Sequence, residues 1–213
     1  MSKATNKKIK RALSVADVLN YAPELLPFTG QWKDAIGLPE LKGSWIIFGE
    51  SGSGKTSFSM QLGKYLCTLD KRTAYDSIEE GVSESIKKAY IRTSMSDVSG
   101  KFLLLDKEPV SELRERLEKR RSPDVIFIDS AQYTGLNKME YKAFVDDFPN
   151  KLFIWISHAK GLMPKGALAE DIYYDANVCI MVKGFKAMVV KSRYGGNGEI
   201  VVSEQKMREY WKL

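Results

Sequence analysis

The sequence of 213 residues has few of the side chains that hold small secreted domains or zinc sites together. It contains two cysteines, Cys67 and Cys179, and one histidine, His158. Two cysteines are too few for a disulfide framework or for a four-cysteine zinc site. We therefore expect a fold that depends on a buried apolar core, which a chain of this length can form without such crosslinks.

Long apolar runs and a secretory signal are also missing. No segment approaches the ~20 apolar residues that cross a bilayer. The basic start, MSKATNKKIKRALS, leads into no apolar stretch of the kind that a secretory signal requires. We expect a cytoplasmic protein without membrane contact, in which residues 1–12 form a basic, flexible tail.

The overall composition is that of a globular protein. Hydrophobic residues make up 44% of the chain and charged residues 28%, which excludes disorder and fibrous repeats. The length fits one ample domain, expected to span residues 1–213. The formal net charge of +6 permits binding to a polyanion but does not require it.

Apolar periodicity predicts alternating strands and helices over most of the chain. Buried strands are expected at 45–48, 73–77, 102–105, 125–128 and 152–156, and helices at 56–69, 83–92, 110–121 and 138–148. After Asn177, short strands at 178–182, 187–191 and 199–202 are joined by turns that contain glycine, which favours antiparallel hairpins. The predicted fold class is α/β, with a mainly parallel central sheet flanked by helices and a C-terminal antiparallel extension.

The segment from Gly49 to Thr56 matches the phosphate-loop pattern G-x-x-x-x-G-K-[ST] at every fixed position. A chance glycine-rich turn is the alternative, but the loop follows a predicted strand and opens a predicted helix, as the pattern requires. Lys55 is expected to bridge the β- and γ-phosphates of ATP, and the Thr56 hydroxyl to ligate Mg²⁺. The predicted nucleotide-binding residues are Gly49, Glu50, Ser51, Gly52, Ser53, Gly54, Lys55, Thr56 and Ser57.

Carboxylates follow two other predicted strands. Asp129 ends the strand at 125–128, where a side chain points into the crevice that binds ligands in sheets of this kind, and we expect it to hold Mg²⁺. A turn or helix-capping role is the alternative for Asp129. Glu79, after the strand at 73–77, is the predicted base that orients the attacking water, with Glu80 as the second choice. The alternative is that both glutamates simply begin the next helix.

These residues, in this order, resemble the RecA superfamily, especially the RadA/Sms-type recombination ATPases and the replicative helicase cores. The similar stretches are the phosphate loop, Ser77-Ile78-Glu79-Glu80, Ile128-Asp129-Ser130-Ala131-Gln132, His158-Ala159-Lys160-Gly161 with Gly166, Leu168 and Asp175, and Lys191-Ser192-Arg193-Tyr194-Gly195. The resemblance covers residues 25 to 204. The zinc-finger and protease-like domains of RadA/Sms proteins have no counterpart here, and Ser192 stands where that family has asparagine.

The resemblance implies a RecA-like sheet in which another strand separates the phosphate-loop strand from the Asp129 strand. It also implies a ring or filament of identical subunits with nucleotide between them. Lys191 and Arg193 would then reach the γ-phosphate of the neighbouring subunit, and His158 would sense the γ-phosphate.

The implied function is an oligomeric ATPase that acts on single-stranded DNA in recombination, repair or replication, with a replication or recombination protein as a possible partner. In this family the loops after the Asp129 and His158 strands line the DNA path. The candidate DNA contacts there are Tyr133, Lys138, Lys160 and Lys165, and Tyr173 and Tyr174 are available to stack on bases. The negative charges of Glu170 and Asp171 in the same loop oppose DNA binding.

Two further hypotheses come from other functional classes. One is a regulatory or assembly ATPase whose nucleotide state controls a protein partner without DNA. The other is a small-molecule kinase, which the absence of an arginine-rich lid segment disfavours.

Overall fold

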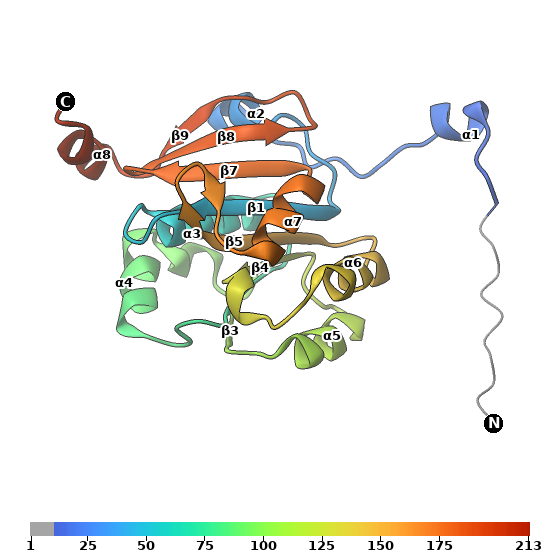
Figure 1. Cartoon of the computed structure of the whole chain (residues 1–213), viewed down its shortest axis with the longest axis horizontal. Helices are drawn as coiled ribbons and strands as arrows, with labels where there is room; N and C mark the ends of the chain where they lie inside the picture. Colours follow the sequence, from blue (N-terminus) through green and yellow to red (C-terminus); the bar gives the residue numbers. More distant parts are fainter. Residues whose placement is uncertain (1–10) are drawn as a thin grey trace.

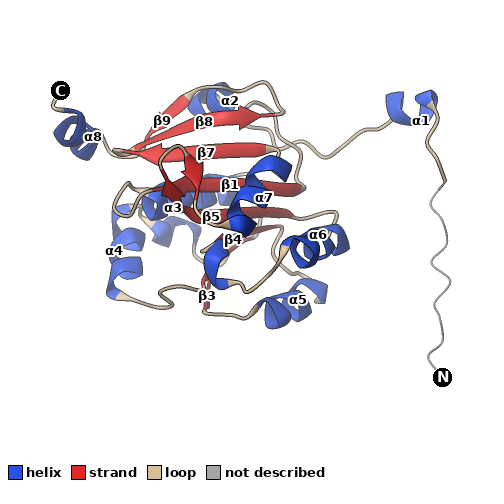
Figure 2. Ribbon diagram, viewed as in Figure 1, coloured by secondary structure: helices blue, strands red, loops and turns tan. Residues whose placement is uncertain are grey.

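The computed structural model describes residues 11–213, so that residues 1–10 of the predicted basic tail lie outside the described part. The chain forms a mostly parallel mixed sheet with helices on both faces (Figures 1 and 2). The strands are β1 (Gly43–Gly49), β2 (Thr73–Ser77), β3 (Phe102–Asp106), β4 (Val125–Asp129), β5 (Leu152–Lys160), β6 (Met163–Pro164), β7 (Val178–Lys183), β8 (Lys186–Ser192) and β9 (Glu199–Val201). The helices are α1 (Val15–Leu19), α2 (Gly30–Ile36), α3 (Lys55–Thr68), α4 (Glu84–Arg92), α5 (Val110–Glu118), α6 (Lys138–Asp147), α7 (Ala167–Asp175) and α8 (Glu204–Trp211), with short 3₁₀ turns η1 (Met95–Val98) and η2 (Ala131–Tyr133).

The strand order is β3-β2-β4-β5-β1-β7-β8-β9, and β6 pairs with β5 outside this order. The strands from β3 to β7 in this order run parallel, whereas β8 is antiparallel to both β7 and β9. The predicted α/β class and the antiparallel C-terminal extension are therefore confirmed. The strand β5 lies between β1 and β4, as the resemblance implied, so that β1 and β4 are separated by one strand.

Each face of the sheet supports its own apolar core. Along β4, Val125 and Phe127 belong to one core cluster, and Ile126 and Ile128 to the other. This alternation arises because successive side chains of a strand point to opposite faces. The first cluster packs under α2, α3 and α4, and the second under α5, α6 and α7. The strands buried on both faces are thus the continuous apolar runs of the sequence.

Some element boundaries differ from the predicted ones. The helix expected at 110–121 ends at Glu118, because Lys119 is extended and Arg121 has a φ of 66°. The strand expected at 152–156 continues to Lys160, where it forms a hairpin with β6. Consequently, His158 lies inside β5 instead of after it. Helices α1, α2, α7 and α8 were not expected, and α7 occupies part of the predicted DNA-binding loop.

The two ends of the described chain lie at the edges of the molecule (Figure 1). Helix α1 buries none of its residues, and α8 buries only Met207. Within residues 11–213, no helix is both long and apolar enough to span a membrane.

Candidate nucleotide-binding site

The phosphate loop connects β1 to α3, as its sequence pattern requires. Gly52 and Gly54 have φ angles of 75° and 106°, which residues with a side chain rarely adopt. Gly49 lies so close to β7 that a Cβ atom there would be 2.2 Å from the Val182 carbonyl oxygen. The loop therefore needs glycine at these positions to turn tightly between the sheet and the helix.

Lys55 is the first residue of α3, and its side chain folds back over the loop. Its Nζ donates hydrogen bonds to the carbonyl oxygens of Gly49 and Glu50, both at 2.9 Å. Burial lowers the pKa of the Lys55 ammonium, while the charges of Asp129 and Glu79 act in the opposite direction. The two carboxylates thus favour the charged form of Lys55, the form that binds phosphate.

Asp129 ends β4 and receives a hydrogen bond from the hydroxyl of Tyr75 on β2. The parallel register pairs Tyr75 with Phe127 and Ser77 with Asp129, which brings the tyrosine beside the carboxylate. Burial raises the pKa of Asp129 to about 6, an effect that the hydrogen bond from Tyr75 opposes. Sequence reasoning missed Tyr75, because the order and register of β2 and β4 are not visible in the local sequence.

Glu79 lies in the turn after β2, next to Asp129 and His158. Its backbone N–H donates to the Asp129 carbonyl oxygen at 3.1 Å, and its Oε2 accepts from the Ser130 hydroxyl at 3.2 Å. His158 Nε2 is 3.3 Å from the same oxygen of Glu79. Glu80 is more exposed, and its carboxylate accepts a hydrogen bond from the Ser83 hydroxyl instead. Of the two glutamates, Glu79 is therefore the one held against Ser130 and His158.

One cavity of ≈ 330 Å³ joins the predicted residues. It is lined by residues of the phosphate loop together with Glu79, Glu80, Asp129 and His158. Sequence reasoning missed several residues that also line it, among them three with large side chains: Arg92 of α4, Phe185 of the β7–β8 turn and Lys206 of α8. No local pattern marks these three residues, because they reach the cavity only through the packing of distant elements.

The residues present fit a magnesium ion. Thr56 and Asp129 bring a hydroxyl and a carboxylate to the same cavity. Within residues 11–213, no three histidine, cysteine, aspartate or glutamate side chains gather in a way that would hold a metal. Mg²⁺ typically binds through one or two carboxylates plus phosphate oxygens and water, so two oxygen donors facing the phosphate loop suit this ion.

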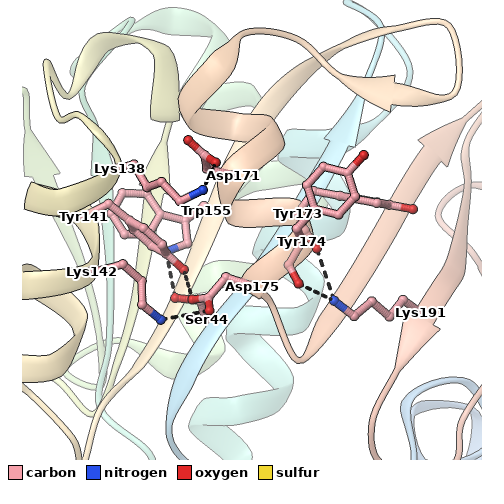
Figure 3. A network of polar contacts seen from close by, with 10 residues as sticks. All are labelled: Ser44, Lys138, Tyr141, Lys142, Trp155, Asp171, Tyr173, Tyr174, Asp175 and Lys191. Atoms are coloured by element: carbon pink, nitrogen blue, oxygen red, sulfur yellow. Dashed lines mark hydrogen bonds and ion pairs between the residues drawn. The ribbon is translucent and has the colours of Figure 1, made fainter.

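Lys191 and Arg193 lie at the amino ends of the parallel strands, whereas the phosphate loop lies at their carboxyl ends. The register pairs Val178 with Trp45 and with Ser192, which places the end of β8 at the amino ends of the parallel strands. Lys191 Nζ donates to the carbonyl oxygens of Tyr173 and Tyr174 at 3.2 and 3.0 Å, at the C-terminal end of α7 (Figure 3). These two cations therefore do not join the cavity of their own chain.

The predicted DNA contacts are only partly free. Lys138 forms an ion pair with Asp171 at 2.6 Å (Figure 3), whereas Lys160, Lys165 and Tyr133 are exposed. Hydrogen bonds connect this region to β5: Gln132 Nε2 donates to the Ser157 hydroxyl and to the Lys165 carbonyl oxygen, both at 2.7 Å. The exposed residues are thus tied to the strand that carries His158.

No protein-family model matches the chain, and no curated protein is similar enough in sequence to match it.

Proposed function

We propose that this protein is a Mg²⁺-dependent ATPase of the RecA-like P-loop type. The observation that supports the proposal best is that Lys55, Asp129 and Glu79, from three separate segments, line one cavity above a phosphate loop. Chance resemblance to the loop pattern would not place a strand-end aspartate and a third charged group in the same cavity. Catalysis of phosphoryl transfer requires mainly positioning and electrostatic stabilisation, which these residues supply.

The side chains have separate roles in the proposed reaction. Lys55 exchanges its two carbonyl acceptors for oxygens of the β- and γ-phosphates. Glu79, held by Ser130 and His158, orients the attacking water and accepts its proton. Thr56 and Asp129 would hold Mg²⁺, and the charge of the bound ion would stabilise negative charge that develops on the phosphate oxygens.

Lys191 and Arg193 fit this function only through a second subunit. Arg193 is exposed at the edge of the sheet far from its own phosphate loop. In a ring or filament, the strand ends that carry Arg193 in one subunit would face the phosphate loop of the next subunit. Arg193 would then reach a neighbouring nucleotide. An arginine supplied in this way accelerates hydrolysis by about 10³- to 10⁵-fold in known systems.

We further propose that single-stranded DNA stimulates the reaction. The exposed Lys160, Lys165 and Tyr133 supply cations and an aromatic face, the groups that bind single strands. Gln132 and the Lys165 backbone connect them to β5, because Lys165 N–H donates to the His158 carbonyl oxygen at 2.8 Å. DNA that moves this region would therefore act on the residues around Glu79.

A regulatory ATPase that controls a protein partner is the second candidate. The ion pair Lys138–Asp171 neutralises one of the lysines that are candidate DNA contacts, which weakens the case for a polyanion. The two candidates differ in their response to salt and DNA. ATP turnover that rises with single-stranded DNA, with binding that weakens steeply as salt increases, supports the first. Nucleotide-dependent oligomers that ignore DNA at low salt support the second.

The ATPase proposal is tested by phosphate release together with nucleotide binding. We expect Lys55→Ala to lose ATP binding, because the cation that bridges the phosphates is gone. Glu79→Gln should bind ATP with Mg²⁺ as the wild type does but lose at least about 10²-fold in turnover. Glu80→Gln is the matched control and should stay active. If Glu80→Gln were inactive and Glu79→Gln active, the assignment of the base would be reversed, and full activity of Lys55→Ala would refute the ATPase site.

A further inference from the structure

A second hollow adjoins the cavity above the phosphate loop. The walls of this extension, of ≈ 190 Å³, include Ser57 and Gln61 of α3, Arg92 of α4, Phe185, Val202 and Lys206. Ser57, Arg92, Phe185 and Lys206 line both hollows, so the two spaces share a wall. Among the described residues, the lining of the extension does not include Lys55, Glu79, Asp129 or His158.

The position of the charged groups gives the direction of a bound nucleotide. The γ-phosphate belongs beside Lys55, Asp129 and Glu79. The nucleoside at the other end of the triphosphate must then leave the loop on the side that lacks the carboxylates. Ser57, one residue after the phosphate loop, and Gln61, one turn farther along α3, mark that side.

The walls of the extension have the chemistry of a nucleoside site. Phe185 lies in the β7–β8 turn, where its N–H donates to the Ser53 carbonyl oxygen at 3.0 Å. Its ring is so close to the phosphate loop that a Cβ atom at Gly54 would lie 2.9 Å from it. Lys206 Nζ lies 5.1 Å from the centre of this ring, and Arg92 Nη2 donates to the Ser57 hydroxyl at 3.0 Å. Aromatic rings and guanidinium planes are the usual stacking partners of bases.

We propose that the nucleoside of the bound nucleotide lies in this extension, between Arg92 on one side and Phe185 with Lys206 on the other. The inference rests on the proposed function and adds to it that α8, at the C-terminal end of the chain, is part of the nucleotide site. Because Met207 is the only residue of α8 that is buried, the bound nucleoside adds a contact that holds α8 against the body.

The competing position for a nucleoside is a hollow of ≈ 180 Å³ on the other side of the loop. Its walls include Gly49, Leu162, Met181 and Tyr210. It shares only Ser51 and Gly52 with the cavity that holds Lys55, Asp129 and Glu79, whereas the extension shares four residues with that cavity. Its walls also lack, among the described residues, the arginine and the phenylalanine that could stack on a base. Tyr210 also belongs to α8, and Tyr210→Ala is therefore the matched control for disturbing this helix without touching the extension.

The test compares ATP with inorganic tripolyphosphate, which lacks the nucleoside. Dissociation constants for both are measured with Mg²⁺ by competition against a fluorescent ATP analogue. For Lys206→Ala and Phe185→Ala, we expect affinity for ATP to fall about tenfold relative to affinity for tripolyphosphate, the loss expected from one stacking or cation–π contact. Tyr210→Ala should leave the ratio of the two affinities unchanged.

The ratio of affinities separates the possible outcomes. Phe185→Ala can also disturb the phosphate loop, but that effect weakens both ligands equally and cancels in the ratio. An unchanged ratio in both variants overturns the inference, as does a change in Tyr210→Ala alone. A wild-type protein that binds tripolyphosphate as tightly as ATP also overturns it while leaving the ATPase proposal intact. A wild-type protein that binds neither ligand refutes the proposed function itself.

Discussion

Asp129 and Tyr75 come from neighbouring strands, and their contact fixes where the carboxylate at the end of β4 points.

The phosphate loop, Asp129 and Glu79 were predictable, because each depends on a short pattern beside a strongly apolar strand. Tyr75, Arg92, Phe185 and Lys206 were not predictable, because their places in the cavity depend on register, a tight turn and a terminal helix. Local patterns therefore predicted the charged residues that line the candidate cavity, and packing supplied the residues around them.

The contact between Tyr75 and Asp129 gives a prediction for magnesium. Removing the hydroxyl in Tyr75→Phe leaves the carboxylate without the donor that orients it. Partners of this kind typically change metal affinity by about 10- to 100-fold. We expect Mg²⁺-dependent ATP binding to need about tenfold more Mg²⁺ in Tyr75→Phe, as measured by Mg²⁺ titration. Tyr90→Phe is the control, because the buried Tyr90 hydroxyl has no partner among the described residues. An identical Mg²⁺ midpoint in wild type and Tyr75→Phe would contradict the prediction.

A buried carboxylate outside the cavity gives a prediction for pH. Asp76 on β2 is fully buried; its Oδ1 accepts from the Glu108 N–H at 3.1 Å, and its Oδ2 finds no partner among the described residues. Burial is the largest cause that raises the pKa of Asp76 to about 7, and the nearby Glu108 carboxylate adds to it. The folded state therefore binds this proton more tightly than the unfolded state, whose carboxyl has a pKa near 3.8.

Because the folded state holds the extra proton, the free energy of unfolding should fall as the pH rises from about 4 to about 7 and then level off. Asp76→Asn keeps a neutral side chain at every pH and should remove this dependence. As the pH rises from 5 to 8, we expect the free energy of unfolding of the wild type to fall by about 2 kcal/mol relative to that of Asp76→Asn, as measured by urea unfolding. The exposed carboxylate of Asp146 on α6 provides the control Asp146→Asn. Parallel pH profiles for wild type and Asp76→Asn would show that Asp76 is ionised in the fold.

Among the elements, the strands were predicted well and several helices were missed. Continuous apolar runs mark β1, β4 and β5, because parallel strands are buried on both faces. Helix α7 was missed because the family resemblance assigned residues 159–174 to a loop. In the structure its Ala169 and Ile172 pack into the core beneath it. Helix α8 has only Met207 as an inward residue, so that its apolar periodicity is too weak to indicate a helix.

Helix α6 shows how local and tertiary interactions act together. Asn137 accepts hydrogen bonds from Met139 and Glu140 N–H, and Glu140 accepts one from Asn137 N–H, which completes a capping box. Farther along α6, the Tyr141 hydroxyl donates to Asp175 of α7 at 2.7 Å (Figure 3). The cap thus supports a helix that in turn holds the end of α7.

Removing this cap gives a prediction for stability. Asn137→Ala should lower the free energy of unfolding by about 1 kcal/mol, the usual value of such a cap. ATP binding should not change, because α6 packs on the face of the sheet away from α3. Met139→Ala is the control within the same turn, since Met139 is 81% exposed. Urea unfolding distinguishes the two variants, and equal stability of Asn137→Ala and wild type would mean that the cap contributes nothing.

At the scale of the whole molecule, the two ends of the sheet carry different parts of the proposed site. The phosphate loop, Glu79, Asp129 and His158 lie at the carboxyl ends of β1, β2, β4 and β5. Lys191 and Arg193 lie at the amino ends of the parallel strands. The sequence pattern alone did not predict this separation, because it depends on the direction of β8 in the sheet. If Lys191 and Arg193 act on the nucleotide as proposed, they must come from a second subunit.

Mixed subunits test this requirement. Arg193→Ala and Glu79→Gln should each be inactive alone. Mixed together, they should recover part of the wild-type turnover, because some interfaces combine an intact Glu79 with an intact Arg193. Mixing Lys55→Ala with Glu79→Gln is the control and should recover nothing, since both residues line the same cavity of one chain. Failure of the first pair to recover at any ratio, in a protein shown to be oligomeric, would rule out action between subunits.

The central claim concerns where a triphosphate binds, and the structure of the complex with a non-hydrolysable ATP analogue and Mg²⁺ measures this directly. We expect the Lys55 ammonium to leave its two carbonyl partners for the β- and γ-phosphates, with Mg²⁺ on the Thr56 side and Glu79 facing the terminal phosphate. A nucleotide bound elsewhere, or one whose terminal phosphate lies away from Asp129 and Glu79, would contradict the account.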